Sequence, residues 1–165
     1  MRTLNVAVLT LLLLATNAFA QKTTPPAAVQ KTTSPVVVET LDGIGIGTSI
    51  DEVRSRLSQI GTGGGRDTRD GGRKEAWTLN ETDYATVAFK TNKAGKVVWV
   101  SAFVRPGREV LFAKLGDPAK ATTLTKSQAI WNVSSASGGY RLVAKGAEGK
   151  ASVVYLLSLD FPEIQ

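Results

Sequence analysis

Residues 84–104, which read YATVAFKTNKAGKVVWVSAFV, decide the fold. Two runs rich in β-branched and aromatic residues, 84–91 and 96–104, flank a four-residue turn that ends in Gly95, a residue suited to the positive φ of a hairpin loop. The predicted register pairs Thr91 with Lys96, Phe89 with Val98, Val87 with Val100 and Ala85 with Ala102. Because this register makes one face wholly apolar, the sequence predicts an antiparallel hairpin.

The opposite face of this hairpin holds the candidate partner-binding residues Trp99, Phe103, Tyr84 and Lys90. If helices cover only the apolar face, these side chains form a solvent-exposed aromatic patch, and such patches mark partner sites. The alternative is that the second half of the chain, or the N-terminal tether, buries Trp99. A further strand over 75–80 would place Trp77 on the apolar side, in the core.

Helix signals precede each of the predicted sheets. Ser49 and Glu52 fit a capping box, and apolar residues at helical spacing continue to Ile60, so we predict a helix that ends at Gly61. The glycine-rich residues 61–65 then begin a predicted polar loop that extends to about Lys74. A second, shorter helix is predicted over 108–115, before Gly116 and Pro118.

The second half of the chain repeats the outline of the first. Strands are predicted over 129–133, 140–145 and 150–158, and Trp131 matches Trp77. The sequence therefore predicts an α+β fold, in which two tandem helix-plus-antiparallel-sheet repeats, 36–105 and 106–165, form one layered domain. When the turns of the two halves are aligned, Val98 corresponds to Ser152, so both should lie on the apolar face. In the second half, however, the more apolar face is the opposite one, which holds Val153. Two explanations are open: a bulge interrupts one of the strands, or the two halves share only the order of their elements.

The first half also resembles a known family. The stretch IGIGTSIDEV at residues 44–53, followed by Trp77 and the turn Gly95-Lys96-Val97, is similar to the BamE/SmpA family of bacterial envelope proteins. This resemblance implies a small α+β module with helices against an antiparallel sheet. Two such units in tandem resemble the fold of the β-lactamase inhibitory protein, which implies a sheet surface that grips another protein and no catalytic residue.

The N-terminus carries export signals. Residues 1–20 read as a signal peptide, with Arg2 before an apolar run and Ala18 and Ala20 at the cleavage positions. Residues 21–35 form a Thr/Pro-rich tether. The apolar run is too short to span a bilayer, and no Cys follows it to take a lipid anchor. We therefore expect a periplasmic or secreted protein with no membrane span.

Composition excludes several classes of chemistry. The chain contains no His and no Cys, which removes Ser-His-Asp and Cys-His nucleophiles, disulfides and the common zinc sites. The glycine-rich stretches match neither a dinucleotide loop nor a phosphate loop. We predict no catalytic residue, no metal and no cofactor. The net charge of +6 is spread along the chain without a dense basic and aromatic stretch, so no nucleic-acid partner is expected.

These observations favour a non-catalytic binding module that docks an envelope or extracellular protein on its sheet face. The alternative is an envelope structural or stress protein that binds cell-wall polymer or lipid through its basic surface. Salt dependence separates the two, because binding through exposed charges weakens as salt is added.

Overall fold

A computed structural model describes residues 37–134 and 138–160. The predicted signal peptide and tether therefore lie outside the described residues. The strands are β1 (Gly61–Asp67), β2 (Arg73–Leu79), β3 (Tyr84–Thr91), β4 (Val97–Val104), β5 (Val110–Leu111), β6 (Thr123–Leu124), β7 (Gln128–Val133), β8 (Tyr140–Ala147) and β9 (Lys150–Ser158). The helices are α1 (Ile50–Ile60), α2 (Phe112–Leu115) and the 3-10 turn η1 (Pro118–Lys120).

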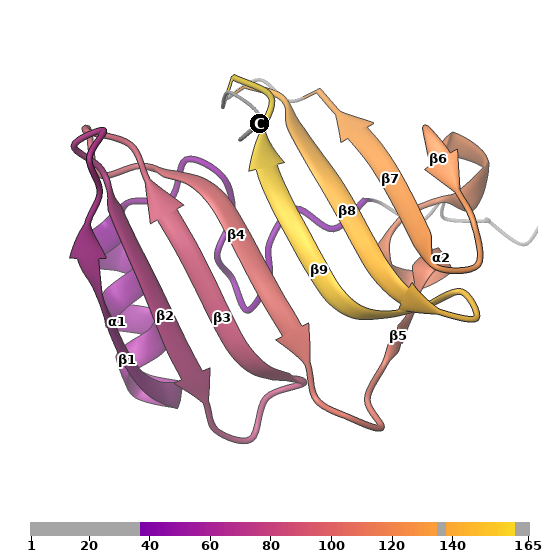
Figure 1. Cartoon of the computed structure of the whole chain (residues 1–165), viewed down its shortest axis with the longest axis horizontal. Coiled ribbons are helices and arrows are strands. Elements are labelled where there is room, and N and C mark those ends of the chain that lie inside the picture. The colour runs from indigo at the N-terminus through magenta and orange to yellow at the C-terminus, as the bar shows by residue number, and fades with distance from the viewer. Residues whose placement is uncertain (1–36, 135–137, 161–165) are drawn as a thin grey trace, which may run out of the picture. The chain divides into compact units, whose positions relative to one another are not determined.

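All nine strands of the described ranges belong to one antiparallel sheet (Figure 1). The strand order is β1-β2-β3-β4-β9-β8-β7-β6, and β5 pairs with one end of β9. Each half of the chain thus builds one side of the sheet, and the two halves meet at the β4–β9 pair in the middle. The order of strands is symmetric about this pair.

The predicted fold class, two helix-plus-sheet repeats, is wrong. The fold is dominated by the sheet, and only the first half contributes a long helix, the eleven-residue α1. The helix predicted over 108–115 is instead the short strand β5 followed by the four-residue α2. At one end, Val110 pairs with Ala151 on β9 and is therefore part of a strand. At the other end, α2 stops before Gly116, so only one helical turn forms between them. An isolated turn has little stability of its own, because helix nucleation is costly.

Helix α1 forms as its sequence predicts. The Ser49 side chain accepts a hydrogen bond from the Glu52 backbone N–H at 3.4 Å, and Asp51 and Glu52 lie in the first turn, where the helix dipole favours negative charge. Val53 and Leu57 are buried against the sheet. The helix ends at Ile60, and Gly61 continues directly into a strand.

That strand corrects the predicted polar loop over 61–74. The glycines of β1 face large side chains of β2, since Gly63 pairs with Trp77 and Gly65 with Glu75. A Cβ at Gly63 would collide with the Ala76 carbonyl oxygen, and one at Gly65 with the Lys74 carbonyl oxygen. The glycines that resemble loop residues therefore allow β1 to lie close against β2.

The predicted register of the first hairpin is wrong by two residues. Phe89 pairs with Val100 rather than Val98, and a bulge lies between Lys90 and Thr91. The second hairpin has a bulge at the corresponding place, between Lys145 and Gly146. A bulge inserts a residue and reverses which side chains face the core beyond it.

These bulges explain the conflict between the two halves. Val97 and Val100 are both buried although they are three residues apart, and Ala151 and Val154 repeat this pattern on β9. Val153 therefore faces away from the core, contrary to the face assigned from the sequence. Trp77 pairs with Val87 as predicted and is buried.

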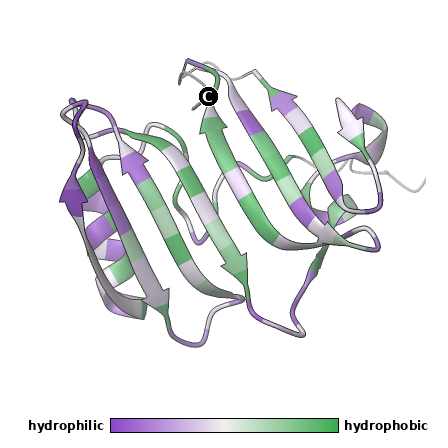
Figure 2. Cartoon of the chain, viewed as in Figure 1, coloured by the Kyte–Doolittle hydropathy of each residue, from purple (hydrophilic) through white to green (hydrophobic). Residues whose placement is uncertain are grey.

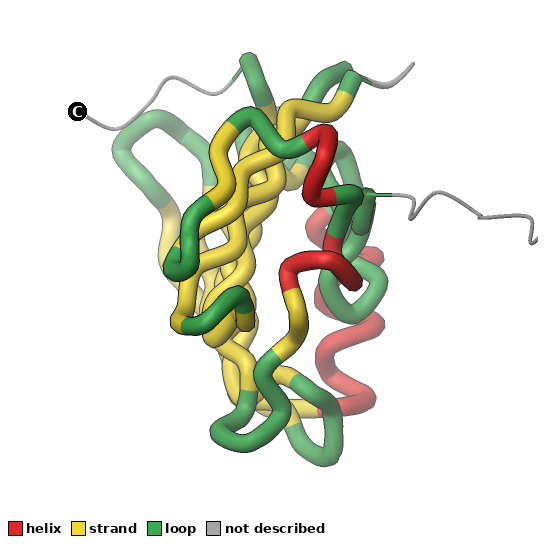
Figure 3. Tube along the Cα trace, turned by 90° about the vertical axis from the view of Figure 1, so that its right-hand side faces the viewer, coloured by secondary structure: helices red, strands yellow, loops and turns green. Residues whose placement is uncertain are grey.

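The core lies on one side of the sheet. Helices α1 and α2 pack on this side, as Figure 3 shows from the edge. The segment before α1 also contributes, because Leu41 and Ile44 are fully buried in the same cluster. Figure 2 shows that hydrophobic positions concentrate in β3, β4, β8 and β9. In the described ranges, the helices leave the reverse of the sheet uncovered; we call this reverse the open face.

Candidate functional site

The open face is an ordered array of side chains, because the strand registers align them in three rows across the sheet. The first row is Arg66, Lys74, Lys90, Trp99, Leu157, Arg141 and Asn132. The second row is Gly64, Ala76, Ala88, Ser101, Tyr155, Val143, Ile130 and Thr123. The third row is Thr62, Thr78, Thr86, Phe103, Val153, Lys145 and Gln128.

The middle of this array is apolar. Phe103 is 46% exposed and pairs with Val153, while Trp99 pairs with Leu157 on the other side of Tyr155. These side chains, Phe103 apart, are half-buried. Together they form an apolar centre on the two central strands, where β4 meets β9.

Cations surround the apolar centre. The rows contain Arg66, Lys74, Lys90, Arg141 and Lys145, and no Asp or Glu occupies any of these positions in the described strands. The Nζ of Lys74 lies 5.3 Å from the centroid of the Trp99 ring, and the Nζ of Lys145 lies 6.0 Å from that of Tyr155. Such cation–π contacts hold each ammonium group next to an aromatic ring.

Lys90 is a cation of these rows that forms an ion pair. Lys90 donates to Asp70, in the turn between β1 and β2, with 2.7 Å between Nζ and Oδ2. Hydrogen bonds from Lys90 and then from Thr68 lower the pKa of Asp70 to about 2. The Asp70 carboxylate is therefore ionised at neutral pH and offsets the charge of Lys90.

Three of the four predicted site residues lie on the open face. Trp99 and Lys90 are neighbours in the first row, and Phe103 is in the third. Trp99 is half-buried rather than enclosed, because β9 lies beside β4 in the sheet instead of over it.

Tyr84 is not part of this group. A register shift between Tyr84 and Thr86 turns the ring toward the core cluster, where it packs. Burial, together with the negative charges of Asp42 and Asp83, raises the pKa of Tyr84 to about 12. Its hydroxyl group therefore stays protonated at neutral pH.

The half of the face that β8 and β9 supply is not predicted from the sequence. Tyr155, Leu157 and Lys145 all lie on it. Alternation along 150–158 groups Tyr155 with Val153, on the face that the sequence assigns to the core, because the bulge leaves no sequence signal. Lys74 is absent from the predicted site because the predicted polar loop extends to about this residue.

A buried ionic cluster lies on the core side of the sheet, beneath α1. The side chain of Glu75 on β2 is 1% exposed, and its Oε1 accepts hydrogen bonds from Arg54 Nε at 2.9 Å and Arg73 Nε at 2.6 Å. Trp77 Nε1 donates to Oε2 at 3.2 Å. Burial alone would raise the pKa of Glu75, but these hydrogen bonds outweigh it, so the pKa lies below its usual value of 4.5. Every acceptor of the group is engaged, which is typical of a structural cluster.

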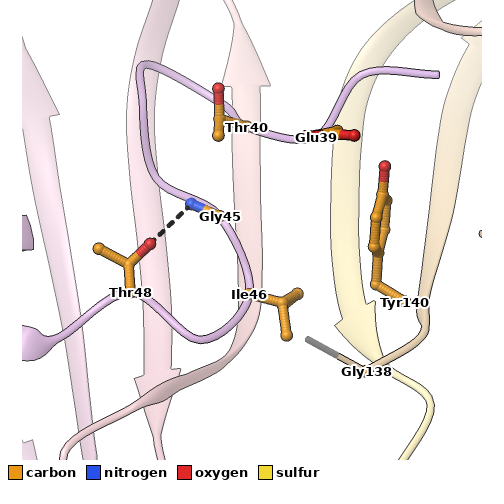
Figure 4. A pocket seen from close by; sticks show the side chains of 7 residues that line it. All are labelled: Glu39, Thr40, Gly45, Ile46, Thr48, Gly138 and Tyr140. Atoms are coloured by element: carbon orange, nitrogen blue, oxygen red, sulfur yellow. Dashed lines mark hydrogen bonds between the residues drawn. The ribbon is translucent and has the colours of Figure 1, made fainter. Parts of the chain in front are cut away.

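One pocket of the described residues has a volume of about 200 Å³. It is lined by Glu39, Thr40, Gly45, Ile46, Thr48, Gly138 and Tyr140 (Figure 4). The Gly45 N–H donates to the Thr48 hydroxyl at 3.3 Å on one side, and Tyr140 stands on the other. Pockets for small molecules usually measure about 300–1,000 Å³, so this space does not compete with the open face as a candidate site.

Two further findings concern metals and membranes. Among the described residues, no three Asp or Glu side chains gather in a way that could hold a metal ion. None of the helices in the same ranges combines the length and the apolarity that crossing a bilayer requires.

Comparison of the chain with protein-family models, with curated proteins and with solved structures finds no significant match. The resemblance to the BamE/SmpA family, and to the tandem fold of the β-lactamase inhibitory protein, therefore stays a prediction. What defines this protein is an antiparallel sheet with one face covered by helices and the other open.

Proposed function

We propose that this chain is an exported, non-catalytic binding module that docks an envelope or extracellular protein on its open face. The observation that carries the proposal is the apolar centre, where Phe103 is 46% exposed on the same face as Trp99 and Tyr155. Aromatic residues and arginine are enriched in the cores of protein interfaces, where a few of them supply most of the binding energy. Export and a periplasmic or secreted location rest on the leader expected over residues 1–20.

The form of the face supports a protein as the ligand. Its residues come from the eight strands β1 to β4 and β6 to β9 and lie in rows across them, so they offer a broad surface. Small-molecule sites are concave and enclose most of their ligand. A broad surface with an apolar centre and a charged rim has the anatomy of a protein–protein interface.

The second candidate is an envelope structural or stress protein that binds cell-wall polymer or lipid. The cations of the rows favour it, since Arg66, Lys74 and Lys145 would attract anionic polymers. Binding of this kind depends strongly on salt and little on the aromatic side chains.

The test is capture from an envelope extract of the native host, with mature chain as bait. Two double variants are compared with wild type. Trp99→Ser with Phe103→Ser removes the apolar centre, and the control Leu111→Ser with Leu124→Ser removes leucines that are 46% and 51% exposed elsewhere. We expect the same proteins to bind wild type and the control but not the first variant, while near-UV circular dichroism shows that all three are folded.

Equal capture by all three baits would rule out the open face as a docking site. Capture of anionic cell-wall polymer that survives loss of the aromatics, but not loss of Lys74 and Lys145, would support the second candidate instead.

A further inference from the structure

We infer that the partner of the open face is an acidic protein surface, in which carboxylates flank an apolar side chain. This inference rests on the proposed function and adds the chemistry of the partner. It starts from Lys74 and Lys145, the two lysines of the face that lie over aromatic rings.

The two lysines are cations held in place. A lysine on an exposed strand ordinarily samples many rotamers, and ordering it costs entropy on binding. Contact with Trp99 and Tyr155 restricts where the Lys74 and Lys145 ammonium groups lie. Because these side chains are already ordered in the free protein, they lose less conformational entropy when they form an ion pair with a partner.

Neither lysine has an ion-pair partner within 37–134 and 138–160. Lys90, one strand from Lys74, shows the contrast, because Asp70 already neutralises it. The open face therefore carries two oriented positive charges, and the described chain supplies no carboxylate that forms an ion pair with either of them. Since no Asp or Glu stands in the three described rows, an acidic surface meets no carboxylate within them, and Asp70 at their margin is already paired with Lys90.

The positions of the lysines define the spacing of their complement. Lys74 is on β2 and Lys145 on β8, and four strand-to-strand steps separate these strands. At about 4.8 Å a step, the two strands lie about 19 Å apart. Both side chains lean inward, toward β4 and β9, so their ammonium groups flank the apolar centre. A partner fits if an apolar side chain covers Phe103 and carboxylates lie on both sides of it.

An anionic bilayer would also satisfy the charges, but it fits the apolar residues less well. Apart from Phe103, the residues of the apolar centre are half-buried and lie along the sheet. Membrane-surface segments instead bury an apolar face several ångströms into the headgroup region. The partner we infer is therefore a protein, and vesicles are an arm of the test.

The test uses nuclear magnetic resonance of the ¹⁵N-labelled mature chain. The three tryptophans give three indole N–H signals, and only one reports on the open face. Trp77 donates to Glu75 and Trp131 to the Asp117 carbonyl oxygen, and both are buried, whereas Trp99 lies on the face. The probes are synthetic peptides with a central Leu-Phe pair between two Asp-Glu pairs, and a matched peptide with Asn-Gln pairs.

We expect the acidic peptide to shift the Trp99 indole signal and to leave those of Trp77 and Trp131 in place. Its affinity should fall about tenfold for the amide peptide, and by the same factor for the variant Lys74→Ala with Lys145→Ala. The matched control, Lys114→Ala with Lys120→Ala, removes two exposed lysines of the helical side and should bind like wild type.

Three results would overturn the inference. The first is equal affinity of the acidic and amide peptides at Trp99. This result would leave the proposed protein-docking function standing but would show that the face does not prefer an acidic partner. The second is no shift by either peptide while the captured envelope proteins still depend on Trp99 and Phe103. The third is a Trp99 shift by phosphatidylglycerol vesicles and not by the acidic peptide, which would assign the face to lipid and remove the proposed function as well.

Discussion

Arg54 of α1 and Glu75 of β2 form an ion pair that joins the long helix to the sheet, with 2.9 Å between Arg54 Nε and Glu75 Oε1. The carboxylate is buried, while the side chain of Arg54 remains 39% exposed. The pair therefore fixes where α1 lies on the covered side of the sheet, and α1 in turn protects that side from water.

Glu75→Ala should destabilise the protein. Loss of the carboxylate leaves Arg54 and Arg73 without their shared acceptor and opens space beside Trp77. Because both arginines can reach solvent, we expect a loss of about 2–4 kcal/mol, near the lower end of the range for broken buried pairs. Urea denaturation measures it. Asp67→Asn, which alters an 84% exposed partner of Arg73, is the control and should change stability by less than about 1 kcal/mol.

The contribution of Glu75 should also depend on pH. Its folded-state pKa lies below 4.5, so the unfolded chain takes up protons at a higher pH than the folded chain. The stabilisation is complete above the unfolded pKa and is lost as the pH falls through the folded one. The difference in unfolding free energy between wild type and Glu75→Ala should therefore be constant near neutral pH and shrink as the pH falls below the usual pKa of 4.5. A difference that grows on acidification would contradict this assignment.

Asp42→Asn should have the opposite effect at neutral pH. Burial raises the pKa of Asp42, and the negative charge of Asp83 adds to this effect, while a hydrogen bond from Thr82 partly opposes it. In the described chain, Asp42 Oδ2 has no hydrogen-bond partner. A raised folded pKa means that the ionised carboxylate costs stability above that pKa. The amide removes the charge, and asparagine accepts the φ of 48° at this position. We expect a gain of less than about 1 kcal/mol at pH 7 that disappears in acid, measured by urea denaturation at both pH values.

Two glycines of β1 offer a matched pair. Gly63→Ala should lower stability by about 1–3 kcal/mol, because the added Cβ meets the backbone of β2 and the Trp77 ring. Gly64→Ala should be neutral or slightly stabilising, since nothing lies within 4 Å of the Cβ and its φ is not positive. Thermal denaturation of both variants checks the expectation. Equal effects would show that β1 does not lie against β2 as described.

Acrylamide quenching of tryptophan fluorescence tests the exposure of the open face. Trp77 and Trp131 are 9% and 1% exposed, whereas Trp99 is half-buried. Trp99→Phe should therefore remove most of the quenchable emission and leave the rest protected. Strong quenching that persists in Trp99→Phe would place the accessible indole elsewhere.

Local signals predicted the local structure well. The cap at Ser49 and the apolar spacing that follows define α1, and alternation along 84–104 defines its two strands. Trp99 and Phe103 fall on the correct side because the predicted register is wrong by two residues, and an even shift leaves each side chain on the same face.

Features set by partners distant in the chain could not be read this way. Glycine ordinarily indicates a loop. In β1, however, the glycines form a strand because they leave room for the side chains of Trp77 and Glu75 on the neighbouring strand β2. Leu111 and Leu115 have the spacing of a helix, but Val110 pairs with Ala151 on β9, which satisfies its backbone and starts a strand instead. The β8–β9 half of the open face could not be predicted for a similar reason, since Ser152 is an inserted residue on β9, opposite Lys145 and Gly146, and it reverses every side chain beyond it.

The meeting of β4 and β9 in mid-sheet has a consequence for how the molecule assembles. Trp99 and Leu157 are neighbours in the sheet but lie at distant points of the chain, and β9 is the last strand. The β3–β4 hairpin can close from adjacent residues as soon as both strands exist, whereas the β4–β9 pair cannot form until β9 is available. A chain emerging from a ribosome or a translocation channel would expose the unpaired edge of β4 until β9 follows, and the open face would be complete only after that step.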